Sequence, residues 1–79
     1  MDAAAYKALV PMLGKFVQIV WFDPNQDWLY YRLLKISRGD GTIFVRGMDL
    51  PNSFGWNKRD AFWANYADVL MINPVMLEI

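Results

Sequence analysis

Every second residue of the segment Phe16–Phe22 falls on the same side of an extended chain, and Val17, Ile19 and Trp21 make one side wholly apolar. This two-residue period, in a run of β-branched and aromatic residues with no glycine or proline, predicts a strand. The opposite side carries Gln18 but is otherwise apolar. A strand with one face in water would alternate more cleanly, so we expect this one to be covered on both sides.

A second strand is predicted over Trp28–Ser37, and its apolar parity changes partway along. From Leu29 to Leu33 every other residue is apolar, and then Leu34 and Ile36 take the opposite parity. Such a change within one strand indicates a β-bulge or a sharp bend. A long bent strand of this kind can contribute to both sides of a small barrel.

The third strand follows a tight turn at Arg38–Gly41, where two glycines are free to adopt positive φ. The returning strand is predicted over Thr42–Arg46. Its alternation places Ile43 and Val45 toward the interior and Phe44 outward.

Two helices are expected beside these strands. The first covers Asp2–Leu13, with Asp2 as its N-cap and Pro11 ending or kinking it. The second begins after Asn57, because Phe62, Tyr66 and Val69 fall on one helical stripe.

The remaining segments complete the expected fold. Gly47–Trp56 is predicted as a loop, Asp68–Asn73 as a strand, and Val75–Ile79 as a final edge strand after Pro74. We therefore expect a single compact α+β domain over residues 1–79. Its centre is a strongly bent, mostly antiparallel sheet or small barrel of four or five strands, with a helix at the N-terminus and a second short helix before the last strands.

Composition adds a constraint that favours a binding partner. Hydrophobic residues make up 56% of the 79 residues, above the roughly 45–50% of an ordinary domain. A small chain has little interior in which to bury them. Eight basic and eight acidic residues give no net charge to keep copies apart. These properties predict a surface that another protein covers.

Several kinds of chemistry are excluded by residue type. The chain has no cysteine and no histidine, which excludes disulfides, thiolate nucleophiles and imidazole catalysis. The spacing of Asp23, Asn25 and Asp27 resembles the first positions of a calcium-binding loop. However, Trp28 and Leu34 occupy the positions where such a loop needs glycine and glutamate. We expect no enzyme activity, no metal and no cofactor.

The candidate binding residues are aromatic and basic, the types that dominate protein–protein hot spots and that also stack on nucleic-acid bases. They are Phe22, Trp28, Tyr30, Arg32, Phe44, Arg46 and Trp56. The preferred interpretation is a non-catalytic interaction module or small accessory subunit. It would bury its outward aromatic residues against a second copy or a heterologous subunit, with the arginines at the rim.

The alternative is a nucleic-acid-binding barrel. It would stack bases on Trp28, Tyr30 or Trp56 and hold phosphates with Arg32, Lys58 and Arg59. The absence of a basic excess favours the protein partner. No apolar stretch reaches the roughly 18–20 residues that cross a bilayer, so we expect no membrane association and a cytoplasmic protein.

The order of elements resembles small β-barrels of the SH3 or Sm type. Gly14 and Lys15 precede the first strand, and the run Thr42–Gly47 is similar to the Ile-Arg-Gly run of Sm proteins. In Sm proteins that run lies near the fourth strand, whereas here it falls on the third. The resemblance implies a fold only, and no binding residue is carried over from it.

Overall fold

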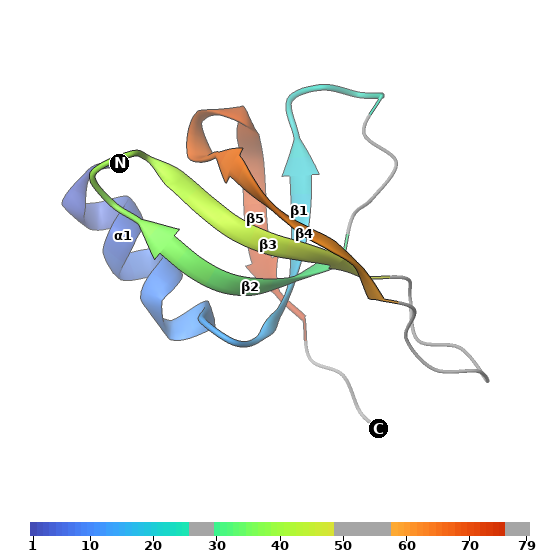
Figure 1. Ribbon diagram of the computed structural model, residues 1–79. Coiled ribbons are helices and arrows are strands. Elements are labelled where there is room, and N and C mark those ends of the chain that lie inside the picture. The colour runs from blue at the N-terminus through green and yellow to red at the C-terminus, as the bar shows by residue number, and fades with distance from the viewer. Residues whose placement is uncertain (26–29, 49–57, 76–79) are drawn as a thin grey trace.

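The computed structural model describes residues 1–25, 30–48 and 58–75, apart from the side chains of residues 48 and 58–60. One helix, two 3-10 turns and five strands follow one another along this part of the chain (Figure 1). In chain order they are α1 (Ala3–Leu9), η1 (Val10–Met12), β1 (Phe16–Trp21), β2 (Tyr30–Ser37), β3 (Thr42–Met48), β4 (Lys58–Asn65), η2 (Tyr66–Asp68) and β5 (Val69–Pro74).

The N-terminal helix forms where the sequence predicts it. The Asp2 side chain caps α1 by accepting a hydrogen bond from the Ala5 amide at 2.8 Å. Pro11 lies in η1, the tighter turn that ends the helical segment. The helix lies beside the β2–β3 hairpin (Figure 1), where the Met1 ammonium donates to the Arg38 carbonyl at 2.9 Å.

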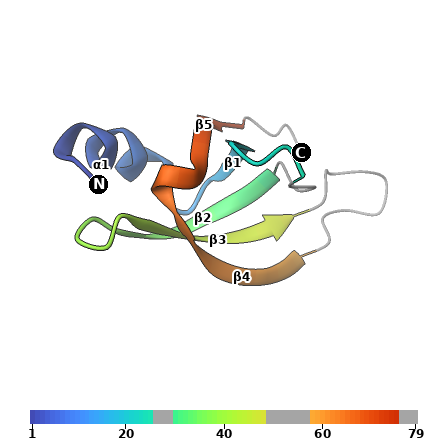
Figure 2. The same ribbon diagram turned by 90° about the horizontal axis from the view of Figure 1, so that it is seen from above.

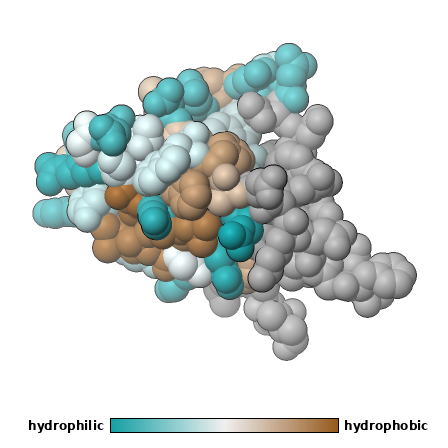
Figure 3. Space-filling view, in the orientation of Figure 1, coloured by the Kyte–Doolittle hydropathy of each residue, from teal (hydrophilic) through white to brown (hydrophobic). Residues whose placement is uncertain are grey.

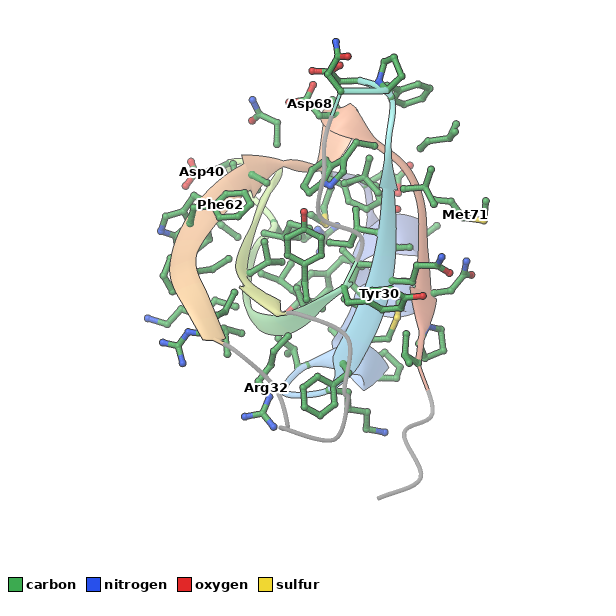
Figure 4. The ribbon with its side chains drawn as sticks, turned by 90° about the vertical axis from the view of Figure 1, so that its right-hand side faces the viewer. Tyr30, Arg32, Asp40, Phe62, Asp68 and Met71 are labelled. Atoms are coloured by element: carbon green, nitrogen blue, oxygen red, sulfur yellow. The ribbon has the colours of Figure 1, made fainter. Side chains whose placement is uncertain are left out.

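The strands form one antiparallel sheet in the order β4-β3-β2-β1-β5. The sheet curls around its interior (Figures 2 and 4) but does not close, so β4 and β5 are its two edges. The α+β class and the bent antiparallel sheet are therefore confirmed, and the sheet is open rather than a closed barrel.

The predicted irregularity in β2 is confirmed. The register against β3 shifts between Leu33 and Lys35, which leaves Leu34 as an extra residue. Leu33 also exchanges backbone hydrogen bonds with the segment before β1, because its amide donates to Lys15 and its carbonyl accepts from Gly14. The bulge thus allows one strand to pair with β3 along its length and with the start of β1 at its beginning.

The core lies on the inner face of the sheet and follows the predicted alternation. Its fully or nearly fully buried members are Leu9 of α1, Val17, Ile19 and Trp21 of β1, Tyr31 and Leu33 of β2, and Ile43 and Val45 of β3. Burying these side chains is the main favourable contribution to folding in a chain of this size.

The predicted second helix is wrong, because residues 58–65 form strand β4. Phe62 pairs with Val45 on the inner face, and Trp63 pairs with Phe44 on the outer face. A strand here satisfies the free edge of β3, which a helix would leave unpaired, and this outweighs the helical spacing of the aromatic residues. Only Tyr66–Asp68 is helical, as the single turn η2.

The end of the chain agrees in part with the sequence. The strand predicted over Asp68–Asn73 is β5. Of the edge strand expected over Val75–Ile79, only Val75 lies within the described residues, and its amide donates to the Phe16 carbonyl at 3.0 Å. Most of the expected loop Gly47–Trp56 lies outside the described residues, whereas Gly47 and Met48 belong to β3.

Candidate interaction surfaces

The predicted binding residues fall into three groups. Trp28 and Trp56 lie outside the described residues. Phe22 follows the end of β1 and is 63% exposed. The structure brings the others together on the outer face of β2 and β3, and they are Tyr30, Arg32, Phe44 and Arg46.

Two arginines on this outer face belong to adjacent strands. Arg32 of β2 and Arg46 of β3 are opposite each other in the register of the two strands. Both side chains are half-buried. The Arg32 guanidinium lies 4.9 Å from the centre of the Phe16 ring on β1, a cation–π arrangement. Its Nε is buried and has no hydrogen-bond partner among the described residues. Figure 4 shows Arg32 projecting outward near the start of β2.

Phe44 points outward, as predicted, but a neighbouring strand covers it. The rings of Phe44 and Trp63 lie 4.9 Å apart and are tilted by 38°. The Lys35 ammonium lies 5.8 Å from the centre of the Phe44 ring. Trp63 itself is 51% exposed. The accessible aromatic group of this region is therefore Trp63, which the sequence analysis placed on a helix.

Three of the described cations share one face of the sheet. Arg32, Lys35 and Arg46, here called the basic face, lie on the outer side of β2 and β3. The space-filling view shows hydrophobic residues at the centre of the visible surface with hydrophilic residues among and around them (Figure 3). The described carboxylates lie at the helix cap, in turns and in η2, and they belong to Asp2, Asp23, Asp40 and Asp68. Among the described side chains, the outer face of β2 and β3 therefore carries three cations and no carboxylate.

An exposed apolar patch lies where β1 ends and β5 begins, and it consists of Phe22, Leu70 and Met71. Leu70 is 54% exposed and Met71 is 49% exposed. Met71 pairs with Val20, and the register shift at the next position leaves Leu70 as an extra residue in β5. The Phe22 amide donates to the Asp68 carbonyl at 3.0 Å, which fixes this end of the strands. Figure 4 shows Met71 directed away from the interior.

The sequence analysis did not single out Leu70 or Met71. A signal was present, because Val69–Pro74 contains no charged residue. What the sequence alone does not reveal is that this strand lies at an edge of the sheet.

An aromatic cleft of about 600 Å³ opens between the end of β1 and β4. Phe62 faces the interior, yet it is 43% exposed because the sheet does not close beside it. Below it, the Trp21 indole donates to the Tyr31 hydroxyl at 3.0 Å. Burial raises the pKa of Tyr31, and the hydrogen bond from Trp21 opposes that rise. Asp23 and Asp68 also line the cleft.

The described carboxylates are dispersed over the molecule. No three of their carboxylates gather into a group that could hold a metal ion. The Asp23 carboxylate accepts a hydrogen bond from the Asn25 amide at 2.9 Å, the contact of an ordinary Asx turn. No helix in the described part of the chain is long and apolar enough to cross a membrane.

A scan against protein-family models and searches of curated proteins and solved structures found no match.

Proposed function

We propose that the protein is a non-catalytic interaction module that self-associates by covering the apolar patch and the free edge of β5 with a second copy. The observation that carries the proposal is the coincidence of three exposed apolar side chains with a strand edge that no other described strand pairs. Soluble proteins seldom expose such a group without a partner.

The edge of β5 supports the proposal independently of the patch. Natural sheets protect free edges with lysine, with inward charges or with a covering element. Among Val69–Pro74 there is no charge, and the one residue that cannot donate to a ladder is Pro74 at the end. A strand added here would form backbone hydrogen bonds and would bury Leu70 and Met71 at the same time.

The composition favours a second copy of this chain as the partner that binds at β5. The chain has no net charge, so two copies approach without repulsion. An interface between copies is also more apolar than a transient one, which matches Phe22, Leu70 and Met71. Phe44 was expected to contribute to this interface, but its ring packs against that of Trp63. We therefore place the proposed interface at β5 rather than around Phe44.

The fold also has a finer interpretation. We interpret the sheet as an SH3- or Sm-type barrel that remains open. The support is an N-terminal helix, a bulged second strand and a 3-10 turn before the last strand. We further propose a cytoplasmic setting, because a chain without cysteine draws no stability from an oxidising compartment.

A positive charge introduced at the edge tests the proposal. Met71→Lys places a cation on β5 without altering the buried core, and it should convert an oligomer to the 9.2 kDa monomer in sedimentation velocity. Val10→Lys is the matched control, since Val10 is similarly exposed but lies in the N-terminal helical segment. An oligomer that survives Met71→Lys, or that is lost equally with Val10→Lys, would show that another surface holds the copies together.

A further inference from the structure

The basic face carries an unbalanced arrangement that self-association through β5 does not explain. Arg32 and Arg46 are directly opposite across β2 and β3. Like charges at such positions destabilise a sheet. Among the described side chains, no carboxylate lies on the outer face of β2 and β3 to balance them, since those of Asp2, Asp23, Asp40 and Asp68 occupy the helix cap, turns and η2. Asp60 belongs to β4, but its side chain lies outside the described residues. The arrangement therefore fits an anion supplied from outside.

The geometry of Arg32 strengthens this argument. Its guanidinium is held against Phe16, so its direction is set before any ligand arrives. Its Nε is buried and has no acceptor among the described residues. A ligand from solution therefore meets the terminal amino groups of the guanidinium. An oxyanion between the two arginines would accept hydrogen bonds from these groups and neutralise the like-charge pair.

An exposed aromatic ring stands next to the arginine pair. Arg46 pairs with Ala61, so Trp63, two residues further along β4, is its diagonal neighbour at the roughly 7–8 Å of such positions. One side of the Trp63 ring rests against Phe44, and the residue is half exposed. A flat group could stack on the free side while its attached anion reached Arg46.

We infer that the outer face of β2–β4 binds single-stranded nucleic acid, with a phosphate held by Arg32 and Arg46 and a base stacked on Trp63. This goes beyond the proposed function and shares no residue with the apolar patch. A phosphodiester chain provides both an oxyanion and a flat base at each step. An acidic peptide would use the arginines but would leave Trp63 without a role.

The site differs from the one that the sequence suggested for nucleic acid. Arg32 belongs to both sets of residues, and the pairing of β3 with its neighbours adds Arg46 and Trp63. The absence of net positive charge does not count against binding, because three of the described cations share this face.

Fluorescence anisotropy with a labelled oligodeoxythymidine of about 12 nucleotides tests the inference. Affinity is measured between about 50 and 200 mM salt for the wild type and for the double variant Arg32→Gln, Arg46→Gln. Each phosphate neutralised on a single strand contributes about 0.7 to the slope of log affinity against log salt. Because Arg32 and Arg46 hold one phosphate between them, the double variant should lower that slope by about 0.7.

Matched variants separate this site from general attraction of anions. Lys7→Gln with Arg38→Gln removes the same charge from the helix and the hairpin, and it should leave the slope within about 0.3 of the wild type. Trp63→Ala should weaken binding by roughly tenfold, and Trp63→Phe should restore most of it. Circular dichroism of each variant confirms that the sheet is intact.

Three results would overturn the inference. One is an absence of oligonucleotide binding by the folded wild type at the lowest salt. Another is an equal loss of slope in the Lys7 and Arg38 control. The third is polyglutamate binding as tightly as the oligonucleotide and without response to Trp63→Ala, which would make the face a site for acidic protein segments. Because Met71→Lys is not involved, failure here leaves the self-association proposal intact.

Discussion

Replacing Tyr31 with phenylalanine removes one hydroxyl from the buried centre of the sheet. That hydroxyl accepts the hydrogen bond from the Trp21 indole at 3.0 Å. The two rings meet edge to face with centres 5.7 Å apart, and Tyr31 also meets Phe62 edge to face at 6.2 Å. Phenylalanine can keep both ring contacts, so the variant isolates the hydroxyl.

The expected loss of stability follows from the Trp21 indole N–H, which remains after its acceptor is removed. Both residues are buried, and the Trp21 N–H would have no acceptor among the described residues. A buried donor left unsatisfied costs about 1–3 kcal/mol. For a domain of this length, about 2 kcal/mol corresponds to a fall of roughly 8–16 °C in Tm. Urea unfolding followed by tryptophan fluorescence measures the difference in free energy.

The pH dependence provides a second readout. Burial raises the pKa of Tyr31 above its ordinary 10.0. The folded state therefore keeps this proton when the unfolded chain has lost it, and the resulting stabilisation is present below about pH 10 and is lost as the pH rises further. Between about pH 9 and pH 11 the free energy of unfolding should fall less steeply in Tyr31→Phe than in the wild type.

Tyr6→Phe is the control for both measurements. Tyr6 is half-buried and faces the Arg38 guanidinium through its ring rather than its hydroxyl. Its loss should change stability by less than about 0.5 kcal/mol. The reasoning is refuted if Tyr31→Phe is equally neutral, or if its alkaline slope matches that of the wild type.

Three further substitutions test the packing, the turn and the basic face. Leu33→Ala empties a fully buried position and should cost about 2–5 kcal/mol in urea unfolding. Gly41→Ala should lower the free energy of unfolding by about 1–2 kcal/mol and so lower Tm, because Gly41 has φ of +66°. A Cβ at this position would also lie 3.4 Å from the Met1 nitrogen. Gly39→Ala is the control and should be nearly neutral, because a Cβ there has no atom within 4 Å. Arg46→Gln should raise the free energy of unfolding by about 0.2–1 kcal/mol by removing the charge opposite Arg32, and a clear loss of stability would contradict the like-charge argument.

The first three strands were predictable because their burial follows local alternation. Val17 and Ile43 are buried where a two-residue period places them, and the change of parity after Leu33 marks the bulge. Strand β4 was not predictable in the same way. Phe62 and Trp63 are adjacent aromatic residues on opposite faces, and their positions are decided by the free edge of β3 rather than by their own spacing.

The candidate surfaces were likewise predictable only in part from the sequence. Parity alone predicts that Arg32 and Phe44 point outward. It does not predict that Arg46 faces Arg32, because that depends on the register between two strands. Exposure of Leu70 and Met71 depends on which strand ends at the edge of the sheet, and this is a property of the whole topology.

The mass of the wild-type protein in solution, measured by light scattering over a dilution series, tests the central claim most directly. Coverage of the apolar patch and of the β5 edge by a second copy predicts a multiple of 9.2 kDa that declines toward 9.2 kDa only on dilution. A mass of 9.2 kDa at every concentration would contradict the account, because Phe22, Leu70 and Met71 would then remain exposed in the isolated chain.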